Sequence, residues 1–124
     1  MPFKIDIEAA RKFQEEKFKK KQDALDVKFL EAKRDFEAIC NMIISEFHPV
    51  AVYQWGSLLD RTKFSEISDI DIAVEGITDA QQYFDLLKKA EELSQFPLDI
   101  VQLESIHPLH KEMILSRGKI IFKK

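Results

Sequence analysis

Residues 49 to 76 read PVAVYQWGSLLDRTKFSEISDIDIAVEG, and the architecture of the chain follows from them. Val50 to Trp55 is rich in β-branched and aromatic residues, which is typical of a buried strand. In Asp69 to Glu75, apolar and polar residues alternate strictly, as they do in a strand with two different faces. The polar residues between these runs predict a loop from Gly56 to Ser68. The segment therefore predicts two strands joined by a polar loop.

The segment before it is predicted to be helical. Between Phe3 and His48 it contains neither Gly nor Pro, the residues that most often interrupt a helix. The first half has few apolar residues, so we expect either that it projects beyond the core or that a break between Lys21 and Asp26 makes two helices. The second half has an apolar stripe that should pack on a core, formed by Leu25, Phe29, Leu30, Ala32, Phe36, Ile39, Cys40, Ile43 and Ile44.

The segment after it predicts a further helix, strand, helix and strand. The strands are expected from Pro97 to Leu103 and, at the edge of the sheet, from Lys119 to Phe122. The second helix is expected from Ser105 to Ser116. Helical spacing predicts the first helix, through Ala80, Phe84, Leu87 and Ala90.

This order of elements predicts an α/β (α+β) fold, in which helices back a small mixed sheet. At 124 residues the chain is too short for two independent cores, so one globular unit is expected. Within it, residues 1–48 are expected to form a long N-terminal helix or helical pair that packs on the core. Residues 49–124 are expected to form the domain that carries the sheet.

The composition excludes several classes of protein. A net charge of −3 and a pI near 5.6 argue against general nucleic-acid binding, which usually needs a basic domain. The single cysteine, Cys40, excludes an internal disulfide and a zinc site built on cysteine pairs. No apolar run approaches the roughly 18 residues that span a bilayer, and Met1 to Lys12 does not read as a signal peptide. We therefore expect a cytoplasmic protein with no membrane partner.

Three carboxylates stand out in the predicted strands. Asp69 and Asp71 are two residues apart, so both project from the same face of their strand. Two carboxylates so close repel each other, and a divalent cation such as magnesium or manganese would relieve that repulsion. Asp99 is a charge within an apolar strand, and it would share their face if the two strands are neighbours. Three carboxylates around one or two metal ions form the clamp used for in-line displacement at phosphorus.

The loop after the first strand offers groups that suit a phosphate. Gly56 lets the backbone approach a phosphate closely, and the hydroxyl of Ser57 can donate a hydrogen bond to it. Arg61 and Lys63 follow in the same loop and would offset the remaining phosphate charge. These four residues are the predicted nucleotide-binding set.

The combined order is Gly56-Ser57, eleven further residues, Asp69-Ile70-Asp71, and a lone Asp99 in a later strand. It resembles the DNA polymerase β-like nucleotidyltransferase superfamily, specifically its minimal nucleotidyltransferase branch, over residues 49–122. The resemblance implies a nucleotidyltransferase fold that transfers a nucleoside monophosphate, expected to be AMP from ATP, to a hydroxyl and releases pyrophosphate. Some members of this branch pair with an all-helical HEPN-domain protein in a toxin–antitoxin system and can adenylylate it.

The resemblance also implies a role for each matching residue. Gly56 and Ser57 match the loop that grips the phosphates. Asp69 and Asp71 match the magnesium or manganese ligands, and Asp99 matches a third carboxylate that helps to hold the metal and can activate the attacking hydroxyl. The loop between Ser57 and Asp69 is one residue longer than the common form and lacks its second glycine.

The long N-terminal helix lies outside the family pattern and leaves two alternatives open. One alternative is a weakly active or inactive module that acts mainly by binding a HEPN-type partner, because Phe13 and Phe18 lie away from the main apolar stripe. The same aromatic residues would otherwise be buried in a homodimer formed through this helix.

Overall fold

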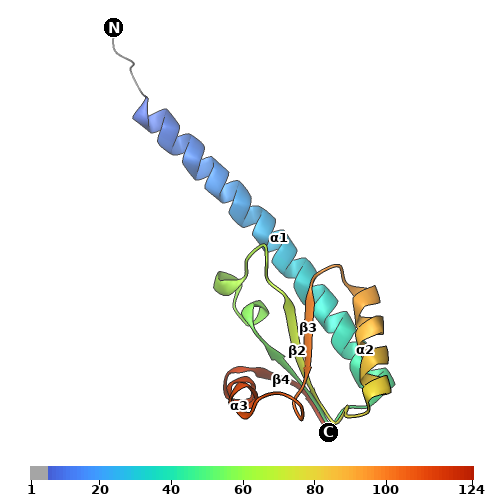
Figure 1. The fold of residues 1–124 in the computed structure, drawn as a ribbon. Coiled ribbons are helices and arrows are strands. Elements are labelled where there is room, and N and C mark those ends of the chain that lie inside the picture. The colour runs from blue at the N-terminus through green and yellow to red at the C-terminus, as the bar shows by residue number, and fades with distance from the viewer. Residues whose placement is uncertain (1–5) are drawn as a thin grey trace.

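The protein is described by a computed structural model that covers residues 6–124. Residues 1–5 of the predicted N-terminal segment lie outside the described residues. The model confirms the predicted mixed α/β fold and the order of its elements (Figure 1). The elements are α1 (Ile7–Phe47), β1 (Ala51–Trp55), β2 (Ile70–Glu75), α2 (Ala80–Leu93), β3 (Leu98–Gln102), α3 (Pro108–Arg117) and β4 (Lys119–Lys123).

Helix α1 is continuous over 41 residues, without a break between Lys21 and Asp26. The carboxylate of Asp6 caps its start by accepting a hydrogen bond of 3.0 Å from the backbone N–H of Ala9. Its second half packs on the sheet and its first half projects beyond it (Figure 1). Leu30, predicted to face the core, is exposed instead. None of the helices in residues 6–124 is both long and apolar enough to cross a bilayer.

The sheet has the strand order β3-β2-β1-β4. Strand β1 pairs antiparallel with β2 and with β4, whereas β2 pairs in parallel with β3. The last strand therefore lies at an edge of the sheet, as predicted. In the parallel pair, Ile70 lies opposite Leu98 and Asp71 lies opposite Asp99.

Helices cover the two faces of the sheet unequally. Both α1 and α2 pack on one face, over a core that includes Ile70 and Ile72 of β2, and α3 packs on the other (Figure 1). Side chains alternate between the faces of a strand, so Asp71 projects toward the α3 face, together with Ala73. The carboxylates are thus separated from the main core by the sheet itself.

Candidate functional site

The structure brings the three predicted carboxylates together. Asp71 of β2 lies directly opposite Asp99 of β3 in the parallel register, and Asp69 immediately precedes β2. Asp71 is only 8% exposed. This burial, and then the negative charges of Asp99 and Asp69, raise the pKa of Asp71 to about 7. The site therefore holds a buried carboxyl group surrounded by uncompensated negative charge.

Gly56 lies directly against this buried carboxyl group. Its φ angle of +84° is one that only glycine adopts readily, and a Cβ atom added to it would lie 1.9 Å from Oδ2 of Asp71. The chain leaves β1 at this point, so a larger residue would displace either the loop or the carboxylate. Glycine at position 56 thus makes room for Asp71, a role that the sequence does not reveal.

A cavity of about 450 Å³ lies beside Gly56, between the loop that follows β1 and helix α3. The loop winds into two short 3₁₀ turns, Ser57–Leu59 and Arg61–Lys63. Three of the predicted nucleotide-binding residues line the cavity together: Gly56, Ser57 and Lys63. The other lining residues are Trp55, Leu59, Asp60, Met113, Ile114, Arg117 and Gly118.

Arg117 is the cavity residue that sequence reasoning missed. It ends α3 and lines the cavity with Lys63, so two cationic side chains border the space beside Gly56 and Ser57. A Cβ atom on Gly118 would lie 2.8 Å from the carbonyl oxygen of Gln54, so this glycine lets the end of α3 approach β1 closely. The Arg-Gly pair at the end of a short helix was the available signal.

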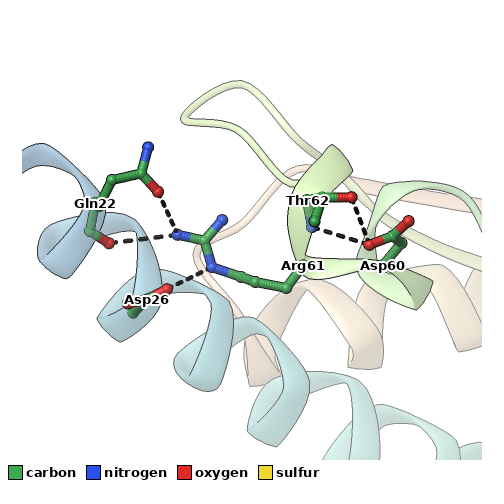
Figure 2. Close-up of polar contacts among 5 residues, drawn as sticks. All are labelled: Gln22, Asp26, Asp60, Arg61 and Thr62. Carbon is green, nitrogen blue, oxygen red and sulfur yellow. Dashed lines mark hydrogen bonds and ion pairs between the residues drawn. The ribbon is translucent and has the colours of Figure 1, made fainter. Parts of the chain in front are cut away.

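Arg61, the fourth predicted nucleotide-binding residue, does not line this cavity. Its guanidinium group points to α1, where Nε lies 2.6 Å from Oδ1 of Asp26 and Nη2 donates to the carbonyl oxygen of Gln22 at 3.3 Å (Figure 2). It also lies over the ring of Phe29. The ion pair with a residue 35 positions earlier holds Arg61 away from the phosphate role that the sequence suggested.

Asp60 lines the cavity, where an acidic group would oppose a phosphate. Its carboxylate accepts hydrogen bonds from the hydroxyl and the backbone N–H of Thr62, at 2.7 and 2.9 Å (Figure 2). The hydroxyl contact first, and then the backbone contact, lower the pKa of Asp60. The Asp60 carboxylate is therefore engaged in shaping the loop.

Trp55 forms a wall of the cavity and lies opposite Asp71 in the β1–β2 register. Its indole ring meets the ring of His110 edge to face, with centroids 5.0 Å apart. The buried Nε1–H of Trp55 has no hydrogen-bond partner among the described residues. Trp55 therefore contributes an apolar wall to the cavity.

The carboxylates of the site are suitable ligands for a divalent cation. Asp69, Asp71 and Asp99 supply only oxygen atoms, which are the ligands that magnesium and manganese prefer. Within residues 6–124, no three acidic, His or Cys side chains already lie close enough together to hold a metal ion. The carboxylates fit such an ion in chemistry and in charge, because its binding would compensate the repulsion around Asp71.

The family model described as polymerase beta, nucleotidyltransferase matches residues 37–124, which include every residue of the site. The chain belongs to this nucleotidyltransferase family. The match begins within α1, so the projecting part of that helix precedes it.

Solved structures agree with the fold of this family. A chain in the crystal structure of a mutant of the toxin–antitoxin pair MntA–HpeT is 20% identical, with a TM-score of 0.59, over 72% of this chain and 73% of that chain. A chain in the crystal structure of the toxin–antitoxin pair MntA–HepT is 20% identical, with a TM-score of 0.57, over 74% and 73%. No curated protein matches the chain in sequence. The nucleotidyltransferase fold is thus supported by both kinds of match.

Proposed function

We propose that this protein is a metal-dependent nucleotidyltransferase that transfers AMP from ATP to a hydroxyl group. The observation that carries the proposal is the parallel register of Asp71 with Asp99, with Asp69 beside them and the Gly56–Ser57 cavity adjacent. Family membership gives the class of reaction, and the residues of this chain supply its parts.

The carboxylates have two tasks in this proposal. Asp69, Asp71 and Asp99 would hold magnesium or manganese, which neutralises charge on the triphosphate and orients it. Asp99 would also accept the proton of the attacking hydroxyl. A bond forms between the acceptor oxygen and the α-phosphorus, the bond from the α-phosphorus to the bridging oxygen breaks, and pyrophosphate leaves.

The cavity would receive the nucleotide. The hydroxyl of Ser57 and the cationic side chains of Lys63 and Arg117 would donate hydrogen bonds to phosphate oxygens. The apolar side chains of Leu59 and Met113, which line the same space, would contact the base or the ribose. One cavity thus offers both an ionic and an apolar region.

The acceptor is proposed to be a hydroxyl group on a partner protein. Chains of similar fold occur in the toxin–antitoxin pairs named above, which favours a HEPN-type toxin as the partner. The carboxylates lie on the α3 face of the sheet, opposite the face that α1 and α2 cover, and a partner would approach the site from that side.

A second candidate is a nucleotidyltransferase-fold module whose catalysis is weak or absent and which acts by binding its partner. The exposed aromatic side chains of Phe13 and Phe18, on the projecting half of α1, favour it. Transfer of label decides between the two. The protein is incubated with α-labelled ATP, magnesium and a HEPN-family protein, with Asp69→Asn and Asp71→Asn as controls. Label on the partner with the wild type alone supports catalysis, whereas binding without label in all three supports the module.

A further inference from the structure

We propose that the groove between α1 and the loop tip Ser65–Ser68 docks an acidic, apolar segment of a partner protein. The groove has a volume of about 400 Å³ and separates Phe18 and Leu25 of α1 from Ile67 of the loop. It rests on the proposed function only in one respect, which is that the docked protein would carry the acceptor hydroxyl.

Two apolar side chains at the groove are unusually exposed to solvent. Phe18 is 64% exposed and Ile67 is 88% exposed, on opposite walls of one depression. Isolated exposed apolar residues are common on protein surfaces, but a pair that faces across a groove is typical of an interaction site. Together they form an apolar contact that a partner side chain would complete.

Both walls are fixed in place before any partner arrives. The loop tip is held by Ser68, whose hydroxyl accepts a hydrogen bond of 2.8 Å from the N–H of Ser65. The α1 wall is held by the ion pair of Arg61 with Asp26 (Figure 2) and by the edge-to-face contact of Phe29 with Phe64, at 5.3 Å. Such rigidity lowers the ordering cost of binding.

The charge around the groove selects the partner. Residues 11–21 of α1 contain six basic and two acidic residues, a net charge of +4. Residues 46–124 contain nine basic and thirteen acidic residues, a net charge of −4. Lys21 lines the groove and Glu66 is its one acidic lining residue, while Asp26 is already paired with Arg61. An acidic partner segment complements this basic surface.

The same charges disfavour a second copy of this chain. Two α1 helices that bring their Phe18 side chains together also bring together two copies of residues 11–21, each with a net charge of +4. The net positive charge of both segments disfavours this pair. A second copy of this chain is therefore a less favourable occupant of the groove than an acidic segment of another protein.

The groove lies close to the carboxylates, so a partner docked in it would be held near the site. Ile67 is two residues before Asp69, so the groove lies within about 8 Å of the first carboxylate along the chain. A segment bound between Phe18 and Ile67 would hold its protein beside the cavity. The long helix, which precedes most of the family match, thereby gains a role in positioning the acceptor.

The test selects peptides from a random 16-residue phage-display library on the full chain, without metal or nucleotide. We expect the enriched peptides to be net negative, with apolar residues three or four apart. A synthetic copy should bind at least tenfold more weakly to Ile67→Asp and to the triple variant Lys19→Glu/Lys20→Glu/Lys21→Glu. The matched control Lys88→Glu/Lys111→Glu/Lys124→Glu, which reverses three exposed lysines elsewhere, should bind like the wild type.

Circular dichroism confirms first that each variant is folded. The proposal is overturned if no peptides are enriched or if the enriched peptides carry no negative charge. It is likewise overturned if Ile67→Asp and the triple variant bind the peptide as tightly as the wild type does. It is also overturned if sedimentation shows a dimer that Ile67→Asp dissociates, or if a labelled 20-nucleotide RNA binds more tightly than the peptide with the same dependence on these variants. Since no ATP is present, failure here leaves the transferase proposal intact, and failure of label transfer leaves the docking result intact.

Discussion

Gly56 lies so close to Asp71 that a Cβ atom at position 56 would come within 1.9 Å of Oδ2 of the carboxylate. The loop that follows β1 and the first residues of β2 therefore form one packed unit. The carboxylate is buried, and the loop packed against it borders the cavity beside Gly56. A substitution at either residue is therefore expected to change the packing of the other.

Gly56→Ala should destabilise the protein by about 2–4 kcal/mol, because it combines a strained positive φ with a steric clash. Asp71→Ala removes the clashing oxygen, so Gly56→Ala in that background should cost only about 1–2 kcal/mol. Urea unfolding of the four proteins of this double-mutant cycle measures the difference. Strictly additive free energies would show that the two residues are not coupled.

The pKa of Asp71 predicts how stability depends on pH when metal is absent. The folded state raises this pKa from 3.8 to about 7, so it retains the proton to a higher pH than the unfolded chain does. Stability should therefore fall as the pH rises from about 4 to about 7. The shift corresponds to at most about 4 kcal/mol, and relaxation of the side chains should reduce the effect to about 1–3 kcal/mol.

Asp71→Asn removes this titrating group and leaves the others in place. In EDTA, the free energy of unfolding of the wild type should drop between about pH 5 and about pH 8 by more than that of Asp71→Asn. Chemical denaturation at both pH values gives the two differences. Equal drops in the two proteins would contradict the assigned pKa.

The cations around the cavity should differ in their effect on nucleotide affinity. Lys63→Ala and Arg117→Ala should each weaken the binding of ATP with magnesium about tenfold, because each removes a charge-assisted hydrogen bond. Arg61→Ala should leave the affinity unchanged, because that guanidinium group is bound to Asp26 on α1. Fluorescence titration with a labelled ATP analogue compares the three variants. Weaker binding in Arg61→Ala alone would reverse the assignment.

The thiol of Cys40 should be unreactive in the native protein. Burial, and then the charge of Glu37, raise the pKa of this thiol to about 12, so almost no thiolate exists at neutral pH. A chromogenic disulfide reagent at about pH 8 should release no colour within an hour from the folded chain and one equivalent at once in guanidinium. Rapid reaction of the folded chain would show that the packing of α1 on the sheet opens readily.

The alternation around Asp69 and Asp71 was enough to predict their strand, and Asp99 stood out as a charge within another apolar strand. What no local pattern contains is the parallel register that sets Asp99 opposite Asp71. Strand order depends on how the whole chain packs, so the meeting of the carboxylates was predicted only on the condition that the strands are neighbours. In the structure, β2 and β3 are neighbours, so this condition is met.

Side-chain direction was harder to predict than the elements themselves. Helical spacing through Phe84 and Leu87 predicted the helix, but it did not predict that Phe84 is exposed and Leu86 is buried. Apolar residues occupy more than one side of α2, and packing on β3 selects its rotation, with the hydroxyl of Tyr83 donating to the carbonyl oxygen of Ile100. The direction of the Arg61 side chain was also not predictable from local sequence, because its partner Asp26 is 35 residues away in the sequence.

The central claim is that Asp69 and Asp71 bind a nucleotide through a divalent cation at the Gly56–Ser57 cavity. Isothermal titration calorimetry with ATP, in magnesium and in EDTA, tests it most directly. We expect the wild type to bind ATP in magnesium only. This binding should be lost in Asp69→Asn and Asp71→Asn variants that keep the wild-type circular dichroism spectrum. Equal binding in EDTA, or binding retained by both folded variants, would contradict it.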